Sequence, residues 1–305
     1  MKTDMSIRSD EPGAKRAAVD TRARYFVIAS ARIAAGLLWL ANLHWKVPPN
    51  FGQDTGGGLY KYTRSAVDNP VWGVWSSITE RVILPNFHLF GWIVILTDGT
   101  LAVLLLLGYR TRLAALVGAF NTIPIFLSVL YYDKSAEWPW SYAMIFFLHL
   151  MLFAVPAGEH SQGIDTALRA DRSARDRAFV VLGGIAVIVG LVGLYLSRDL
   201  DFATRQVAFF GHAKWELKLI WFNGLAAVLT IAFGVAFIMG ARYRVIGLVA
   251  SGGFAVMALV VLVQQHWNNV SKGAPAVVGT ASNAAFWAMF ALAGTVMIRA
   301  DRRQR

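Results

Sequence analysis

The sequence predicts an all-α integral membrane protein with about eight transmembrane helices, arranged as two four-helix bundles that repeat in parallel. Three observations predict this fold class. The chain has 305 residues, of which 56% are hydrophobic and only 15% are charged, and its mean hydropathy is +0.50. The apolar residues form long runs with almost no charge, and a short basic turn recurs at matching places in the two halves of the chain. A water-soluble fold of this length would need more charged residues to cover its surface.

Eight apolar runs of about 20 residues divide the chain, and this is the length that a helix needs to cross ~30 Å of hydrocarbon. The predicted spans are 25–44, 88–107, 113–131, 139–156, 178–197, 219–239, 245–265 and 281–298. The predicted domains are a disordered cytoplasmic tail over 1–24, a four-helix module over 25–168, a diverged second module over 178–298 and a cytoplasmic tail over 299–305.

The placement of Lys and Arg predicts the orientation of these spans. The segments assigned to the cytoplasm hold 18 Lys and Arg, whereas the outer segments hold ten although they are longer. This excess predicts a multi-pass protein of the cell membrane with both termini in the cytoplasm. The net charge of +11 lies mostly in tails and short loops of one side, so we expect the lipid bilayer and no nucleic acid as a partner.

The internal repeat is predicted from a basic turn. The sequence LGYRTRL at Leu107–Leu113 matches MGARYRV at Met239–Val245, and in both places one apolar run precedes the turn and another follows it. An even number of spans in each half gives the halves the same orientation, which predicts an axis along the membrane normal. The first half alone has a long outer segment, 45–87, in which we expect an amphipathic helix near 70–82 and a mobile loop over Phe51–Gly58.

Three polar residues inside the first four spans are candidates for function. Arg32 lies in span one and Asp98 lies in span two. A charge near the middle of a bilayer costs about 2.5–3.5 kcal/mol, so we expect these two residues to form an ion pair that either locks the helices or lines a site. His149 lies in the middle of span four, where it is either a neutral hydrogen-bonding residue between helices or a proton relay.

The outer ends of the spans carry further candidates. His44, His88, His212 and His266 lie there without metal-ligand spacing on any one helix, so no metal site is predicted. Lysines and arginines interleave with tryptophans on the same side, as in an aromatic belt or in a site for a small dianion. We take Lys46, His44 and His88 as the candidate substrate-binding residues. Cysteine is absent, which excludes disulfides, thiolate metal sites and cysteine-bound sulfur intermediates.

With these residues laid out, residues 25–168 resemble the DoxX family, and more particularly its DoxD-like branch. The resemblance rests on five short motifs: Arg32 with Gly36, Trp45-Lys46, Asp98-Gly99, the turn Leu107–Leu116, and Ser161–Asp165. The family usually has glutamate where this chain has Asp98, and the second half resembles it only weakly.

The resemblance implies a four-helix membrane module that in some members is part of a thiosulfate:quinone oxidoreductase. On this basis we expect a membrane subunit of a quinone-linked redox complex, with Arg32, Asp98 and His149 around a quinone head and a partner redox subunit nearby. A small anion such as thiosulfate would bind at the outer rim near Lys46. Because other members have accessory roles, a non-catalytic scaffold and a lipid or solute transporter remain alternatives, and catalysis itself is left open.

Overall fold

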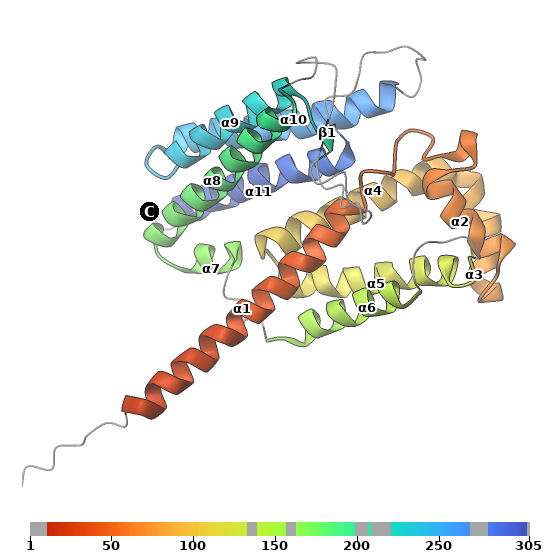
Figure 1. Ribbon diagram of the computed structural model, residues 1–305, viewed down its shortest axis with the longest axis horizontal. Coiled ribbons are helices and arrows are strands. Elements are labelled where there is room, and N and C mark those ends of the chain that lie inside the picture. The colour runs from red at the N-terminus through yellow and green to blue at the C-terminus, as the bar shows by residue number, and fades with distance from the viewer. Residues whose placement is uncertain are drawn as a thin grey trace, which may run out of the picture.

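The computed structural model describes residues 11–132, 139–156, 163–198, 207–208, 221–268 and 280–303, which are almost entirely helical (Figure 1). The helices are α1 (Glu11–Ala41), α2 (Gly58–Asp68), α3 (Gly73–Ile78), α4 (Phe87–Leu107), α5 (Thr111–Val129), α6 (Pro139–Ala154), α7 (Ile164–Arg169), α8 (Arg172–Leu196), α9 (Gly224–Met239), α10 (Arg244–Asn268) and α11 (Ala281–Arg303). Short helical turns at Gln53–Thr55, Thr79–Ile83 and Leu84–Asn86 connect them. A two-stranded antiparallel sheet pairs β1 (Val207–Ala208) with β2 (Trp221–Phe222).

Six helices of the described segments are long and apolar enough to cross a membrane. They are Val19–Ala41, Gly73–Leu107, Thr111–Val129, Arg172–Leu196, Arg244–His266 and Ala281–Arg303. The apolar helices α6 and α9 have 16 residues each, or about 24 Å, and are shorter than the hydrocarbon core. The chain is therefore a multi-pass membrane protein in which six of the eight predicted spans reach full length.

The ends of the described chain are more helical than predicted. We expected a disordered tail over 1–24, but α1 begins at Glu11, and α11 continues through most of the tail predicted at 299–305. Residues 11–24 contain four alanines together with lysine and arginine, which are strong helix formers, and they extend a helix that the bundle already holds. Residues 1–10 lie outside the described part of the chain. The start of α1 and the end of α11 lie on the same side of the bundle as α7 (Figure 1).

The helices pack in pairs that follow the chain order. Helix α1 packs against α4 and α5 against α6 in the first half, and α8 packs against α9 and α10 against α11 in the second. A parallel repeat would require the same order in both halves. Because the matching sequence is confined to one short turn in each half, the repeat stays a prediction.

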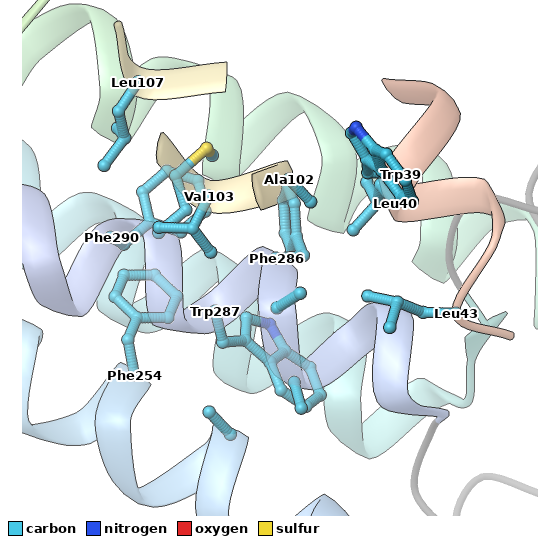
Figure 2. Close-up of a cluster of buried hydrophobic side chains, with 14 of the residues drawn as sticks. Trp39, Leu40, Leu43, Ala102, Val103, Leu107, Phe254, Phe286, Trp287 and Phe290 are labelled. Atoms are coloured by element: carbon cyan, nitrogen blue, oxygen red, sulfur yellow. The ribbon is translucent and has the colours of Figure 1, made fainter. Parts of the chain in front are cut away.

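Helix α11 joins the two halves. It is the most buried of the six long apolar helices. In its most apolar stretch of 18 residues, 72% of the residues are buried inside the protein, against 28–39% in the other five helices. Trp287 and Phe290 of α11 lie fully buried between Phe254 of α10 and the apolar side chains of α1 and α4 (Figure 2). The core of the molecule therefore lies at the junction of the halves, and it fixes the position of α4.

The long segment 45–87 caps one end of the first half, which we call the loop side (Figure 1). The prediction of a mobile loop at Phe51–Gly58 is wrong for its first residue. Phe51 is fully buried, and its ring packs against the Gly91 backbone and edge-on to Trp92, with the ring centroids 5.9 Å apart. The apolar residues predicted to form an interfacial helix are divided between α3 and the turns that lead into α4, and Trp72 and Val74 are more than half exposed.

The opposite end of the bundle, which we call the hairpin side, carries the two basic turns. The first turn ends α4 with Gly108 in the left-handed conformation, at φ 64°. The Gly108 N–H donates to Leu105 O at 3.2 Å and the Tyr109 N–H donates to Leu104 O at 3.0 Å. This is a Schellman motif, which requires positive φ and so favours glycine.

Candidate functional site

The carboxylate of Asp98 lies at the centre of the first half. It projects from the middle of α4 and is fully buried. Lys46 Nζ forms an ion pair with Asp98 Oδ2, and the Asn121 side-chain amide of α5 donates to Asp98 Oδ1 at 2.9 Å. Three segments of the chain thus converge on one carboxylate, and this convergence offsets the cost of holding the charge in the bilayer.

Lys46 reaches Asp98 because the chain turns back after α1. Helix α1 ends at Ala41, and the Lys46 N–H donates to Leu43 O at 3.2 Å within the following turn. The Lys46 side chain is only 2% exposed, and its ammonium lies 4.9 Å from the centroid of the Trp45 ring. A residue that the sequence places at the outer rim therefore has its charge inside the bundle.

The predicted ion pair between Arg32 and Asp98 is wrong, since the cation paired with Asp98 is Lys46. The Arg32 guanidinium instead donates to Leu105 O and, at 2.9 Å, to Leu106 O. These carbonyls lie at the end of α4, about two helical turns from Asp98 toward the hairpin side. The last carbonyls of a helix carry partial negative charge and attract a cation, so Arg32 acts as a cap for α4.

A cavity of about 120 Å³ adjoins the buried pair, and we call it the Lys46 cavity. Lys46 and Asn121 lie in its wall, and both contact Asp98 from that side. The remaining lining residues are Asn42, Trp45, Leu59, Tyr62, Thr63, Trp75, Phe90, Val94, Pro124, Ile125, Ser128, Val129 and Tyr142. The wall is mostly aromatic and aliphatic, with a few polar groups, which is the usual composition of a small-molecule site.

Several polar groups in this wall bond to one another. The Trp75 indole N–H donates to Ser128 Oγ at 3.0 Å, and the Ser128 hydroxyl donates to Pro124 O at 2.7 Å. The Trp45 indole N–H donates to Asn42 Oδ1 at 3.1 Å. These bonds hold the Trp45 and Trp75 side chains in place in the cavity wall. The hydrogen-bond donors of the wall that lie nearest to the Asp98 carboxylate are the Lys46 ammonium and the Asn121 amide. The cavity can therefore bind a neutral, flat acceptor better than an anion, because Asp98 already neutralises Lys46.

His149 lies in a different place from the Lys46 cavity. Its Nε2 accepts a hydrogen bond from the Trp39 indole N–H at 2.8 Å, and its Nδ1 lies 2.7 Å from Ile145 O. Because an indole N–H can only donate, Nε2 is the acceptor and Nδ1–H donates to the carbonyl, which assigns the neutral Nδ1–H tautomer. The structure thus matches the interhelical hydrogen-bonding interpretation, and it does not bring His149 to Asp98 or to Arg32.

The histidines predicted for the substrate site lie apart from the Lys46 cavity. His44 is half-buried, and its Nδ1 lies 2.6 Å from Ala41 O. It lines a second cavity of about 310 Å³, the side cavity, which shares Asn42, Trp45, Ile125 and Tyr142 with the Lys46 cavity. His88 is exposed on α4. Among the described residues no group of three or more His, Asp and Glu is placed to hold a metal ion, and His212 lies outside them.

The basic rim of the loop side is only partly described. Lys61 is exposed, and a hydrogen bond from its ammonium to the Tyr132 hydroxyl raises the pKa of Lys61. Arg64 pairs with Asp68 at 2.9 Å on the surface of α2, and Arg81 is exposed. Lys214 and Lys218, which belong to the predicted rim, lie outside the described residues.

Sequence reasoning missed Asn121, although its signal is visible. Asn121 and Thr122 interrupt an otherwise apolar stretch of α5, and a primary amide in the middle of a span needs a partner. Asp98, the acid in the neighbouring span, is the hydrogen-bond partner that this reasoning would have suggested for the Asn121 amide.

Comparison with known protein families identifies the family of the first half. The model of the family described as TQO small subunit DoxD matches residues 27–189, just over half of the chain. This range contains Arg32, Lys46, Asp98, Asn121 and His149, and it ends inside α8 rather than at the predicted boundary of the first module. No curated protein and no solved structure matches the chain. The match confirms the resemblance of the first half, and the chain belongs to the DoxD family.

Proposed function

We propose that this protein is the quinone-binding membrane subunit of a redox complex, with eight membrane crossings and both termini in the cytoplasm. The observation that carries the proposal is the buried Lys46–Asp98 pair, held by Asn121 and adjoining an aromatic-lined cavity. The family description, TQO small subunit, supports both the membrane role and the partner subunit.

The residues of the Lys46 cavity fit the head of a quinone. Its volume of about 120 Å³ is close to that of an engineered cavity of roughly 150 Å³ that binds benzene, so it accommodates a single six-membered ring. Trp45, Trp75 and Tyr142 supply aromatic walls on which a flat ring can stack. The Lys46 ammonium and the Asn121 amide supply the donors that a quinone carbonyl needs.

Each polar residue then has a defined role. When bound, a quinone accepts two electrons and two protons. Lys46 donates a hydrogen bond at Nζ and is the nearest proton source, and Asp98 orients that ammonium through the ion pair. Asn121 fixes the Asp98 carboxylate through its Nδ2–H. Arg32 and His149 position helices around this group instead of contacting the ligand.

The reductant is proposed to be thiosulfate or a similar small anion, oxidised on the loop side. A dianion is disfavoured inside the Lys46 cavity, since Asp98 lies directly behind Lys46. The chain has no cysteine on which sulfur could be carried. The anion is therefore oxidised at the outer surface together with a partner subunit, and this chain receives the electrons at the bound quinone.

A scaffold without catalysis is the second candidate, and one observation favours it. The Lys46 and Asp98 charges neutralise each other, and both Asp98 oxygens accept a hydrogen bond, as in a purely structural pair in a membrane. Transport fits less well, because Pro124 is the only proline beyond the first turn of the described helices α1, α4, α5, α6 and α8 to α11.

The two functions differ in the binding of quinone to the purified chain. We would titrate the protein in mild detergent with decylubiquinone and follow the quenching of tryptophan fluorescence. Asn121→Leu removes an amide from the cavity wall, and we expect it to weaken binding about tenfold. Thr230→Val is the matched control, because Thr230 is a buried residue of the second half that accepts from Trp287 Nε1 at 3.0 Å. This control should bind quinone as the wild type does.

The activity measurement uses membranes that contain the chain with its partner subunit. Thiosulfate-dependent quinone reduction should fall about 100-fold in Asp98→Asn, because Lys46, the proton source, loses the carboxylate that orients it. Saturable quinone binding that is unchanged by Asn121→Leu would place the ligand elsewhere and remove the proposed site. If no quinone binds and the partner subunit still co-purifies with every variant, the scaffold is the correct function.

A further inference from the structure

The turn between α4 and α5 on the hairpin side encloses a cavity of about 330 Å³, which we call the turn cavity. Arg110, Thr111, Arg112 and Arg169 line it, together with Leu113 and Asp165. It lies at the opposite end of the bundle from the Lys46 cavity and shares no lining residue with it. Whatever binds there is therefore independent of the proposed quinone site.

The N-terminus of α5 opens into this cavity without a side-chain cap. Its N-cap residue, Arg110, has φ 50° and ψ 40°, and no side chain accepts from the first turn. The first three residues of this 19-residue helix line the cavity, and their N–H groups carry the positive end of the helix dipole. A helix N-terminus in this state attracts an anion.

A second observation points to a ligand at the same place. Thr111 is only 2% exposed and lines the turn cavity, and its hydroxyl has no hydrogen-bond partner in the described structure. A buried hydroxyl without a partner is costly, and an oxyanion at this position would satisfy it.

The charges around the turn cavity favour an anion. Arg110, Arg112 and Arg169 oppose one carboxylate, Asp165, which accepts from the Arg110 backbone N–H at 2.8 Å and interacts electrostatically with Arg32 behind the turn. The Nε–H of Arg112 donates to Phe153 O at 3.0 Å, so four further N–H donors remain on that guanidinium. Arginines arranged in this way bind phosphoryl groups well.

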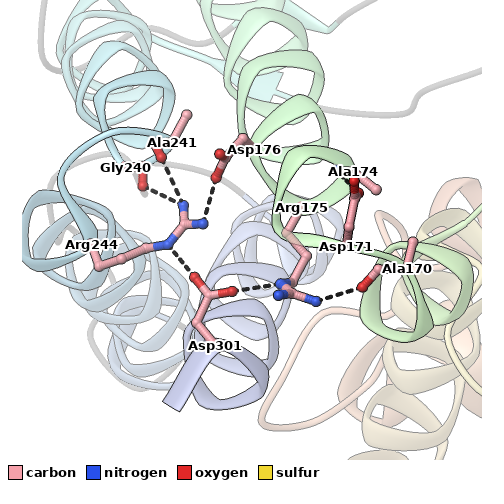
Figure 3. Close-up of polar contacts among 9 residues, drawn as sticks. All are labelled: Ala170, Asp171, Ala174, Arg175, Asp176, Gly240, Ala241, Arg244 and Asp301. Atoms are coloured by element: carbon pink, nitrogen blue, oxygen red, sulfur yellow. Dashed lines mark hydrogen bonds and ion pairs between the residues drawn. The ribbon is translucent and has the colours of Figure 1, made fainter. Parts of the chain in front are cut away.

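In the matching turn of the second half, Arg244 is held by ion pairs with acidic residues. Arg244 pairs with Asp301 and Asp176, and it donates to Gly240 O at 2.7 Å and Ala241 O at 3.1 Å (Figure 3). Asp301 also pairs with Arg175 of α8. Arg244 of the second turn is thus paired with acids of α8 and α11, whereas two arginines of the first turn and Arg169 of α7 line a cavity.

We propose that the turn cavity binds the phosphoryl group of an anionic membrane lipid. The surface beside it suits the rest of such a molecule. Leu113, Val117 and Phe120 are 41–65% exposed and lie at helical spacing along α5, so they form an apolar stripe that leads away from the cavity. A phosphate at the helix N-terminus and acyl chains along this stripe together match an anionic phospholipid.

The test measures lipid binding to the full chain by native mass spectrometry in mild detergent, with dioleoyl phosphatidylglycerol as the probe. Thr111→Val removes the hydroxyl and keeps the shape, and we expect it to weaken binding about tenfold. Thr111→Ser restores the hydroxyl and should restore binding. Arg169→Gln should weaken binding about fivefold, while the matched control Arg242→Gln, an exposed arginine of the second turn, should change it less than about twofold.

Each result decides the proposal. Equal losses in Arg169→Gln and Arg242→Gln, or no loss in Thr111→Val, would show that the lipid follows the general basic surface, and the site would be withdrawn. A second arm replaces the lipid with inorganic phosphate and follows thermal unfolding. Stabilisation by phosphatidylglycerol alone supports the lipid site, whereas equal stabilisation by millimolar phosphate overturns the lipid assignment in favour of a soluble phosphoryl anion.

Discussion

A buried carboxylate such as that of Asp98 is held by the residues that contact it. Lys46 supplies the opposite charge, and Asn121 supplies a hydrogen bond at the second oxygen. Removing one member of a buried ion pair leaves an uncompensated charge, whereas removing both can be close to neutral. A single variant and the double variant should therefore differ in stability, whereas both should lose quinone binding if the pair is functional.

We therefore predict that Asp98→Asn lowers the free energy of unfolding by about 3–5 kcal/mol, because it leaves the Lys46 ammonium unpaired. The double variant Lys46→Met with Asp98→Leu should unfold within about 1–2 kcal/mol of the wild type and yet fail to bind quinone. Thermal unfolding in mild detergent measures the first effect, and the quinone titration measures the second.

The exposed pair of α2 provides the control for this prediction. Asp68 is 52% exposed and pairs with Arg64, so Asp68→Asn should change stability by about 0–1 kcal/mol. A cost for Asp98→Asn no larger than that of Asp68→Asn would contradict the buried ion pair.

The partner of Asp98 could not be predicted from the sequence, and the reason is geometric. Helical spacing gives the depth of Arg32 and Asp98 along their spans, and arginine can cover the difference in depth. Spacing does not show which face of each helix is turned toward its neighbour. It also does not predict the position of the Lys46 side chain, because Lys46 lies in a turn beyond the end of α1. The intramembrane charges were thus correctly singled out, but their pairing depended on a turn that has no sequence periodicity.

At the scale of elements, close approach of helices positions α1, α5 and α6 in the first half. Helix α5 packs against α6 at Gly118, where a Cβ atom would lie 2.2 Å from His149 Cδ2. The same histidine accepts from Trp39 of α1, so one ring connects three helices. The absence of a side chain at Gly118 allows this arrangement, as small residues generally do in membrane interfaces.

We predict that Gly118→Ala destabilises the protein by about 1–3 kcal/mol, because the added methyl overlaps the His149 ring. Gly252→Ala is the matched control, since Gly252 lies exposed in α10 with nothing within 4 Å of an added Cβ, and it should be neutral or stabilising by up to about 1 kcal/mol. Both are measured as shifts in thermal unfolding. Equal effects at the two glycines would refute the close contact.

Most of the fold was predictable at this scale, since long apolar runs specify spans. The described helices match six predicted spans at full length, and α6 and α9 match the other two as shorter helices. The loop side was less predictable. The burial of Phe51 depends on the gap left by Gly91, a contact between residues 40 positions apart that no local pattern encodes.

At the scale of the whole molecule, the first half holds the Lys46 cavity and the second half supports it. Helix α11 packs against α4 at the junction, and the Arg175–Asp301–Arg244 cluster anchors its end on the hairpin side (Figure 3). Among the residues that the structure describes, the second half has no counterpart of the Lys46–Asp98 pair, and Arg244 of its turn is paired with Asp176 and Asp301. The two halves therefore differ in their buried charges despite their similar order of helices.

The predicted topology can be tested directly, because the chain has no cysteine and needs no background substitutions. Single cysteines at Arg110 and Arg242 should react with a membrane-impermeant maleimide only from the cytoplasmic side. A cysteine at Lys61 should react only from the opposite side, and the unsubstituted chain is the blank. Labelling of Arg110→Cys and Arg242→Cys from different sides would rule out eight crossings.

The convergence of Lys46, Asp98 and Asn121 also has a consequence for membrane insertion, because the three residues are synthesised in that order. A helix that carries Asp98 enters the bilayer at a cost of about 2.5–3.5 kcal/mol when it is alone. Lys46 precedes Asp98 in the chain, so the growing polypeptide has its cation in place before the acid emerges from the ribosome, and the amide of Asn121 follows one span later. We therefore expect α4 to insert into the membrane less efficiently in a nascent chain that lacks Lys46.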